Sequence, residues 1–508
     1  MFGEVGYILG KMKTRTIAKP TIDVAQTTRQ AFAAEIPSSA RRPWWRVAWL
    51  LLLLLLSAAL YMLLIKVAPA LDAVLITPFL QVWMLCFVPY VVACLFVLLT
   101  KPASGSWRWV ELGIIFTGAL AFRVMVLSLP PNLSHDSWRY LWDARVTLHG
   151  YSPYVYVPWD KVFVPLRDFI YDNSRFRNVP TIYPPGAQAV YLLSYLLAPS
   201  NLFFLKGIFI VFDMVTCGAL ALLLARRGLD PRRMIIYAWC PLPVVEFAIQ
   251  GHMDVVTLMF MMLAVLCATF SWRGSRTLTG FLIGMATLTK IYPIFLLVVI
   301  MRRRDWPLLF TCLATIIVGY IPFLVLGHGQ VLGYFATYSV EQGGNAGVVQ
   351  LVIYSITHSH GFPLATTITI ERIVDVMVVF GMSLVVLVLR LLKVSVEATS
   401  LLMIGTILAI SSHVFPWYTT VLLPWIALLI GPVWARQGLN GKGLAVLMAW
   451  YFSAASLAGY FFNDTLDWHV YYWSVYAVVM AGLGIAFTVG MWRYVQDLHR
   501  LKIEGKPK

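Results

Sequence analysis

The stretch VAWLLLLLLLSAALYMLLIKVA at residues 47–68 contains one charged residue, Lys66, in 22 positions. A helix needs about 20 mostly apolar residues to cross the ~30 Å hydrocarbon core of a bilayer. The stretch meets that length with almost no polar side chains. It therefore predicts a membrane-spanning helix.

Similar apolar runs recur along the rest of the chain. The 508 residues are 60% hydrophobic and 12% charged, with a mean hydropathy of +0.78. Soluble globular proteins do not have this balance, so we predict an all-α polytopic membrane protein. The net charge of +16 comes largely from Lys and Arg in short segments between the runs, where they set orientation. We therefore expect the lipid bilayer, and no nucleic acid, as a partner.

The Lys and Arg distribution predicts the topology. Both termini (1–46 and 493–508) are placed in the cytoplasm as tails, and 129–183 and 327–367 are placed outside the plasma membrane. Segment 186–198 becomes an interfacial helix, because a crossing there would put the basic 226–233 outside. The 12 predicted spans are about 47–68, 76–99, 109–128, 202–225, 234–249, 253–271, 307–326, 368–392, 397–412, 414–430, 443–461 and 470–491.

One apolar segment does not fit a single crossing. LTGFLIGMATLTKIYPIFLLVVIMRRRD at 278–305 has basic residues at both ends, and Lys290 and Pro293 interrupt its middle. Each half is too short for a relaxed crossing, so we predict a short broken hairpin with Lys290 near its tip. A lysine inside the membrane is costly and indicates function. The alternative is a structural ion pair with Asp213 or Glu246.

The most polar stretch directly follows a predicted span. HDSWRYLWDARVTLH at 135–149 is predicted to be an interfacial helix with Trp138 and Trp142 on one face and Asp136 on the other. A plain amphipathic connector would explain the tryptophans. It would not explain an aspartate at the helix start beside the membrane, although a helix-capping role would do so in part.

The motifs SHDSWRYLWDARVTLHGYSPYVYVP (134–158), PTIYPPGAQAVY (180–191), GHMDVVTLMFMMLA (251–264), TLTKIYPIFLLVV (287–299) and HVFPWYTTVLLPWIAL (413–428) follow one another in this order. Together they resemble the GT-C superfamily of membrane glycosyltransferases, most closely the polyprenol-phosphate-mannose-dependent mannosyltransferases. The resemblance covers about 109–430, which we expect to be a catalytic module. Residues 47–108 and 431–492 would then add flanking helices.

Two motifs depart from the family pattern. The family commonly has an acidic pair where this chain has His135–Asp136, and a histidine directly before Pro-Trp-Tyr where this chain has HVFPWY at 413–418. These departures bear on the roles of His135 and His413.

The resemblance implies an inverting glycosyltransferase. Its donor would be mannose or another hexose on a polyprenyl or dolichyl phosphate, and its acceptor a glycan or glycolipid. Asp136 is the candidate general base, and Arg139 and Lys290 are the candidate phosphate-binding cations. The other candidates for donor or acceptor binding are His135, Tyr140, Asp143, Tyr183, His252, Asp254 and His413.

The weaker candidates have structural alternatives. His252 and Asp254 lie at a predicted turn and could serve it as cap residues, and Tyr183 could be an interfacial anchor. No cluster has metal-ligand spacing, so we expect no cofactor; a divalent metal at the acidic outer loops is the less favoured alternative.

Two rival functions remain. A transporter or lipid-linked glycan flippase would have broken helices in each of two related halves, whereas this sequence predicts a single broken hairpin. A ligase of the O-antigen type would use the same outer face.

Overall fold

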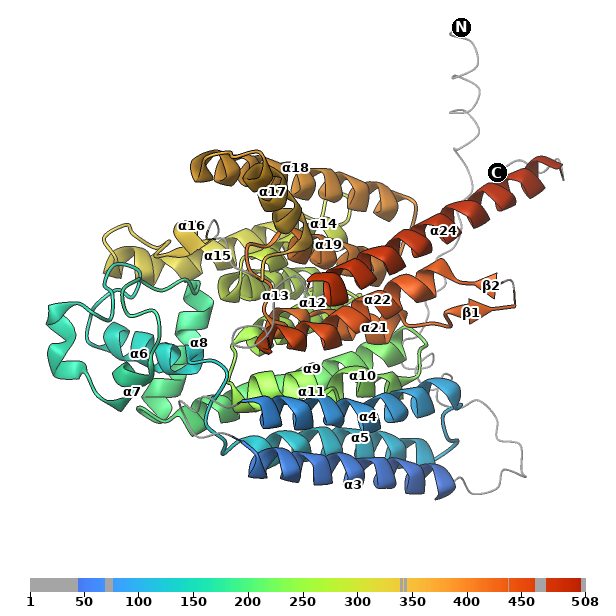
Figure 1. Ribbon diagram of the computed structural model, residues 1–508, viewed down its shortest axis with the longest axis horizontal. Helices are drawn as coiled ribbons and strands as arrows, with labels where there is room; N and C mark the ends of the chain where they lie inside the picture. Colours follow the sequence, from blue (N-terminus) through green and yellow to red (C-terminus); the bar gives the residue numbers. More distant parts are fainter. Residues whose placement is uncertain are drawn as a thin grey trace, which may run out of the picture.

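The computed structural model describes residues 44–68, 76–338, 341, 345–436, 438–461 and 472–503 (Figure 1). The predicted N-terminal tail, apart from 44–46, and the last five residues of the C-terminal tail lie outside this part of the chain. The described residues are helical except for irregular connections and one small antiparallel hairpin. Its strands are β1 (Trp434–Ala435) and β2 (Gly438–Leu439), paired Trp434 with Leu439.

Within the described residues, eight helices are long and apolar enough to cross a membrane. The protein is therefore a multi-pass, all-α integral membrane protein. The spans are α3 (Trp44–Lys66), α4 (Thr77–Leu99), α5 (Trp107–Val126), α9 (Leu202–Arg226), α15 (Trp306–Leu326), α18 (Leu364–Leu391), α22 with η5 (Gly441–Ala455, Ser456–Tyr460), and 474–496 within η6 (Tyr472–Ala477) and α24 (Val478–Ile503).

The predicted number of 12 spans is not found, because four of the predicted segments form shorter or interrupted helices. Pro241 and Pro243, which lack a backbone N–H, divide the 234–249 run into short pieces. That run is buried throughout in protein, where irregular backbone is tolerated at membrane depth. The shorter elements are η2 (Pro231–Met234), α10 (Ile235–Ala238), α11 (Pro241–Pro243), η3 (Val244–Ile249), α12 (Asp254–Cys267), α19 (Val396–Ile410), α20 (Pro416–Thr419) and α21 (Leu422–Leu429).

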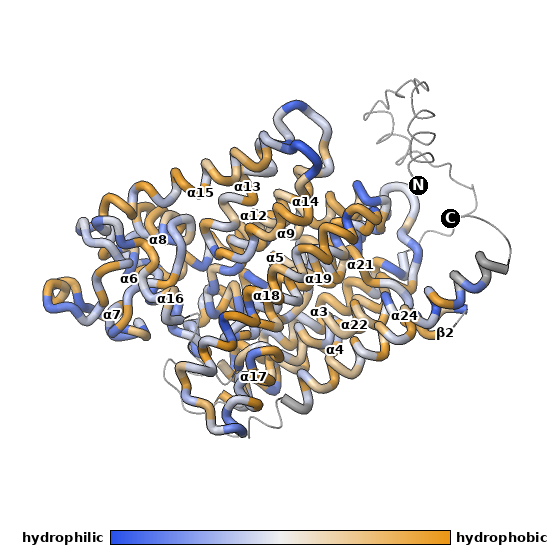
Figure 2. The backbone as a smooth tube through the Cα atoms, turned by 90° about the horizontal axis from the view of Figure 1, so that it is seen from above, coloured by the Kyte–Doolittle hydropathy of each residue, from blue (hydrophilic) through white to orange (hydrophobic). Residues whose placement is uncertain are grey.

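The long helices run side by side, and the segment 129–201, here called the cap, covers one end of the bundle (Figure 1). The long helices are mainly hydrophobic, whereas the cap is mixed (Figure 2). Helices α5 and α9 lead into and out of the cap, and α16 and α17 lie near the same end. The elements here are α6 (Asp136–Leu148), η1 (Lys161–Leu166), α7 (Phe169–Asn173), α8 (Pro185–Leu197), α16 (Phe335–Tyr338) and α17 (Val348–Ser359).

Helix α6 lies where it was predicted, but the prediction that its tryptophans face the membrane interface is wrong. Trp138 is 8% exposed and Trp142 is 1% exposed. The connection after α6 folds back over the helix, so that Trp138 packs edge-to-face on Phe169 and Trp142 contacts Phe163 and Tyr171. The helix is therefore buried on all sides inside the cap.

The broken hairpin is confirmed. It consists of α13 (Ser275–Thr289), an extended residue Lys290, η4 (Tyr292–Phe295) and α14 (Leu296–Ile300). Arg276 Nε donates to Asp305 Oδ2 at 2.9 Å, which ties the two ends of the hairpin together. A side chain at Gly280 would lie 2.2 Å from the Leu308 carbonyl, so this glycine permits the close packing of α13 on α15. The hairpin thereby carries Lys290 toward the cap.

Candidate active site

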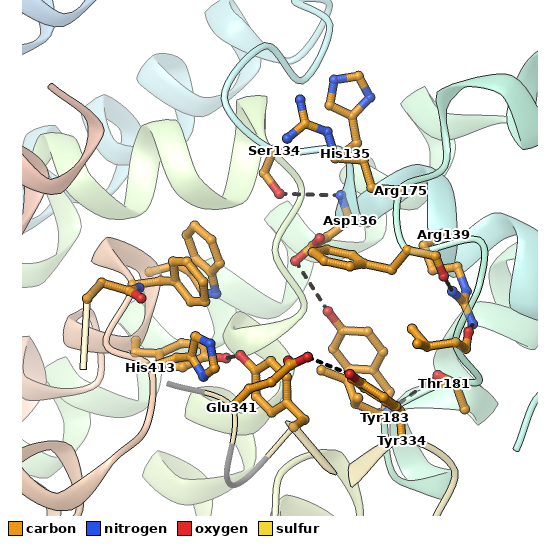
Figure 3. A pocket seen from close by; sticks show the side chains of 18 of the residues that line it. Ser134, His135, Asp136, Arg139, Arg175, Thr181, Tyr183, Tyr334, Glu341 and His413 are labelled. Carbon is orange, nitrogen blue, oxygen red and sulfur yellow. Dashed lines mark hydrogen bonds between the residues drawn. The ribbon is translucent and has the colours of Figure 1, made fainter. Parts of the chain in front are cut away.

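A cavity of about 420 Å³ lies between the cap and the end of the bundle (Figure 3). Its wall comes from five separate parts of the chain: the start of α6, the loop before α8, the α16 region, and the turns around 413–418 and around 459–460. The lining residues that matter below are Asp136, Arg139, Arg175, Tyr183, Tyr338, His413, Phe415, Trp417, Tyr418 and Tyr460.

Asp136 is the first residue of α6, and its carboxylate lines the cavity. The helix has no side-chain cap, so the capping explanation for Asp136 does not hold. Tyr183 donates its hydroxyl to Oδ2 at 3.3 Å, and the side chain is 22% exposed. Burial, together with the charge of Asp254, raises the pKa of Asp136 to about 6. A carboxyl group with this pKa is suited to general-base chemistry near neutral pH.

Lys290 pairs with Asp254, the first residue of α12. Its Nζ donates to Asp254 Oδ1 at 2.6 Å and lies 3.8 Å from the centroid of the Tyr418 ring. The pair is almost buried, with side chains 17% and 9% exposed. Lys290 is thus paired with Asp254, and the expected alternative of an ion pair with Asp213 or Glu246 is wrong.

Those two acids have other partners. Asp213 receives a hydrogen bond from Arg123 Nε at 2.6 Å within the bundle. Glu246 accepts hydrogen bonds from Tyr460 at 3.0 and 3.2 Å.

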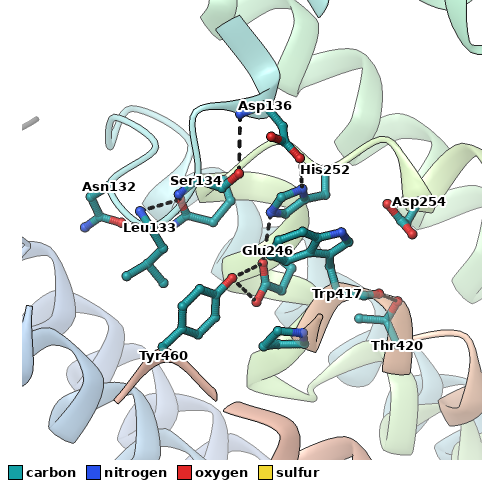
Figure 4. Close-up of polar contacts among 12 residues, drawn as sticks. Asn132, Leu133, Ser134, Asp136, Glu246, His252, Asp254, Trp417, Thr420 and Tyr460 are labelled. Atoms are coloured by element: carbon teal, nitrogen blue, oxygen red, sulfur yellow. Dashed lines mark hydrogen bonds and ion pairs between the residues drawn. The ribbon is translucent and has the colours of Figure 1, made fainter. Parts of the chain in front are cut away.

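His252 lies below Asp136 at the tight turn between η3 and α12 (Figure 4). Its Nδ1 is 3.9 Å from Asp136 Oδ2, and its Nε2 is 3.3 Å from Glu246 Oε2. The turn depends on Gly251, which has φ of +72° and leaves room for the side chains of Lys206 and Ser137. The turn thus places His252 beside Asp136, and Asp254 beside Lys290.

A column of aromatic rings connects His252 to the cavity. His252 stacks on Trp417 at 3.8 Å, Trp417 on Phe415 at 4.4 Å, and His413 on Tyr338 at 4.6 Å. Phe415 and His413 complete the column with centroids 5.8 Å apart. His413 and Phe415 lie in the segment that leads into α20, with Phe415 in an extended conformation, and Trp417 is the second residue of that helix.

Arg139 holds the cap together. It donates to Asp143 Oδ1 at 2.7 Å and to the carbonyls of Phe176 and Val179 at 2.7 and 3.0 Å. Asp143 is buried and also accepts from Gln188 at 3.2 Å. Arg139 lines the cavity, but its guanidinium group is already bonded; its contact with a phosphate stays a prediction.

His135 and Tyr140 flank the site. His135 lines the cavity, and its Nδ1 is 2.8 Å from the Asn173 carbonyl. Tyr140 is buried, stacks on Tyr191 at 4.4 Å, and has its hydroxyl 3.3 Å from that of Tyr183. Both orient the Asp136 segment.

Sequence reasoning missed several members of the site. Arg175 is exposed, lines the cavity, and has no hydrogen bond or ion pair within the described residues. Its charge acts on Asp136. Glu246 and Tyr460 were also not assigned to the site. Glu246 carried a signal, because it is the single charged residue in the apolar run 234–249.

Within the described residues, no group of three or more His, Cys, Asp or Glu side chains is arranged to hold a metal ion.

Part of the chain matches a known protein family. The profile of Glycosyltransferase family 87 matches residues 181–416, which include Tyr183, His252, Asp254, Lys290 and His413. No curated protein matches the chain. The matched segment holds the hairpin, the Asp254–Lys290 pair and the aromatic column up to Phe415. Residues 181–416 are therefore similar to Glycosyltransferase family 87.

Proposed function

We propose that the protein transfers mannose or another hexose from a polyprenyl or dolichyl phosphate to a hydroxyl group of a glycan or glycolipid, on the extracytoplasmic face. The observation that carries this proposal is a carboxylate, Asp136, that faces a 420 Å³ cavity at the end of an apolar helix bundle. A donor whose reactive phosphate is joined to a membrane-embedded chain has its sugar at this depth.

The reaction would be a single displacement with inversion. The acceptor oxygen forms a bond to the anomeric carbon while the bond from that carbon to the phosphate oxygen breaks. The electron pair leaves with the lipid phosphate, and the acceptor proton passes to Asp136. Tyr183, which donates to Asp136 Oδ2 at 3.3 Å, holds the carboxylate in place.

Cations would stabilise the charge that grows on the leaving phosphate. Lys290 is the first candidate, because its Nζ lies over the ring of Tyr418, which lines the cavity. Arg175 is the second, since its guanidinium group has no protein partner among the described residues and lies at the cavity wall. Arg139 would have to exchange one of its present hydrogen bonds for the phosphate.

Purified protein with isotopically labelled donors tests this function. We expect release of polyprenyl phosphate and transfer of the sugar when the donor is a polyprenyl-phosphate hexose, and no transfer from a nucleotide sugar. A flippase would move the labelled lipid across vesicle membranes without cleaving it. A ligase would use only a preassembled glycan on its carrier. Either result would refute the proposal.

The transfer rate should depend on the protonation of Asp136. Because burial raises its pKa to about 6, the carboxylate becomes protonated, and useless as a base, as pH falls through this value. We expect kcat/KM to be level above pH 7 and to fall about tenfold per pH unit below pH 6. A profile that is level from pH 4.5 to 8 would contradict the role of this carboxylate.

The extracytoplasmic location predicts which loops an impermeant thiol reagent reaches. We expect Asp172→Cys, in the cap, to be labelled in intact cells and Leu229→Cys to be labelled only after lysis. The native cysteines are all buried, so the unmodified protein is the control. Labelling of Leu229→Cys in intact cells would contradict the predicted cytoplasmic location of residues 226–233.

A further inference from the structure

We infer that Gln250 is a positioning residue, which fixes the base Asp136 on the cap relative to the Asp254–Lys290 pair on the helix bundle. Gln250 lies in the turn between η3 and α12, and its side chain is fully buried. It is not one of the residues that line the cavity, so it would act on the reaction through Asp136. The inference rests on the proposed function and adds to it the part of the fold that places the base.

The side-chain amide of Gln250 binds the residues that lead into α6. Its Oε1 accepts hydrogen bonds from the backbone N–H groups of Leu133 at 3.0 Å and Ser134 at 3.3 Å. Its Nε2 donates to Asn132 Oδ1 at 2.8 Å. Backbone N–H groups can only donate, so the oxygen of the amide must face them. Three consecutive residues of the cap are thus bonded to one side chain of the bundle.

These contacts extend to the backbone of Asp136. Ser134 Oγ accepts a hydrogen bond from the Asp136 N–H at 3.3 Å, and Figure 4 shows the two residues next to each other at the start of the helix. Helix α6 also packs on the turn, because a side chain at Gly251 would lie 3.2 Å from Ser137 Cβ. The backbone on both sides of Asp136 is therefore fixed to the turn.

The same turn also places the candidate cation. Asp254 follows Gln250 by four positions and accepts a hydrogen bond from Lys290 Nζ at 2.6 Å. In an inverting displacement the acceptor oxygen and the leaving phosphate lie on opposite sides of the anomeric carbon. The base and the cation must therefore keep a fixed separation across the sugar. Residues 250–254 can set this separation, because they contact the segments that carry both groups.

A buried lysine strengthens the connection between cap and bundle. Lys206, on α9, is 2% exposed, and its Nζ donates to the carbonyls of Leu129 at 2.6 Å and Ile249 at 3.4 Å. Among the described residues, no carboxylate lies within ion-pair distance of this ammonium group. A buried cation without a counter-charge is costly. Here it joins the first residue of the cap to the residue directly before Gln250.

The test compares Gln250→Met with Gln250→Glu. Methionine has a similar length but cannot replace the amide hydrogen bonds, so the segment before Asp136 is released from the turn. We expect kcat to fall about 10- to 100-fold with the donor Kd within about twofold, because a small misplacement of a reacting group is costly in rate. Thermal stability is measured for each variant, and rates are expressed per donor-binding site, which separates loss of folded protein from loss of turnover.

Gln250→Glu should restore the rate because it keeps the acceptor oxygen. In its neutral form, the O–H group donates to Asn132 Oδ1 as the amide does. In its ionised form, Asn132 Nδ2, which has no hydrogen-bond partner among the described residues, can turn to donate to the second oxygen. We expect kcat within about threefold of that of the unmodified protein.

The matched control is Gln350→Met. Gln350 is 5% exposed, and its Nε2 donates to Asp375 at 2.9 Å between α17 and α18. It does not line the cavity. This variant removes the same amide from another buried position, so we expect an unchanged kcat per donor-binding site even if the thermal stability falls.

The double variant Asp136→Asn with Gln250→Met shows whether Gln250 acts through the base. With no base left to misplace, Gln250→Met should slow the Asp136→Asn protein by less than about twofold. A wild-type kcat in Gln250→Met, equal losses in Gln250→Met and Gln250→Glu, or the same fold loss with and without Asp136 would refute the inference. None of these results touches the proposed function. That function, and this inference with it, fails if Asp136→Asn transfers sugar at the wild-type rate.

Discussion

Replacing Asp136 by Asn lowers kcat for sugar transfer by about 100-fold or more, while the protein still folds and binds donor lipid. Asn has the size of Asp and still accepts a hydrogen bond from Tyr183, but it cannot take the acceptor proton. General-base catalysis is worth roughly 10²–10⁴-fold, so the loss falls on turnover. Helix α6 keeps its stability, because Asp136 does not cap it. Steady-state kinetics and donor binding on the same preparation measure this.

The matched control is Asp143→Asn, on the same helix. Asp143 is buried and pairs with Arg139 at 2.7 Å, so its loss leaves a buried guanidinium group without a counter-charge. We expect a lower thermal stability of the order of several kcal/mol, with the chemistry intact in the folded fraction. If Asp143→Asn is folded and inactive while Asp136→Asn is active, the wrong carboxylate has been assigned.

Replacing Lys290 by Met lowers kcat/KM for the donor by about 100-fold. Loss of a cation aimed at the leaving phosphate removes stabilisation that appears mainly in the transition state. The single variant also leaves the Asp254 carboxylate without a counter-charge, because Lys290 Nζ lies 2.6 Å from Asp254 Oδ1. Kinetics must therefore be measured together with thermal stability.

A double variant separates the two effects. Lys290→Met with Asp254→Asn removes both charges, so we expect stability to return while donor use stays impaired. If the double variant transfers sugar at the wild-type rate, Lys290 is only the structural partner of Asp254. Arg175, which lines the cavity and has no hydrogen bond or ion pair within the described residues, would then be the candidate cation, and Arg175→Gln its test.

Local sequence signals predicted much of the site. The hairpin followed from basic residues at both ends and from Lys290 and Pro293 in its middle, and the structure has this arrangement. Asp136 was placed at a helix start because the chain had just left an apolar run. These signals need only short stretches of sequence.

The rest depended on contacts between distant parts of the chain. The burial of α6 comes from residues 160–173 folding back over it, and no periodicity within α6 records this. Tyr460 reaches Glu246 from 214 positions away, so no local pattern pairs them. Only eight of the 12 predicted spans are long apolar helices within the described residues. Composition alone does not separate them from the shorter runs, because apolar runs buried inside protein have the same composition as runs that face lipid.

The most direct test of the account is a structure of the Asp136→Asn protein with a bound polyprenyl-phosphate hexose. We expect the phosphate within hydrogen-bond distance of Lys290 or Arg175, the anomeric carbon facing residue 136, and the prenyl chain leaving the cavity toward the bilayer. A donor phosphate bound elsewhere, with the 420 Å³ cavity empty, would contradict the account.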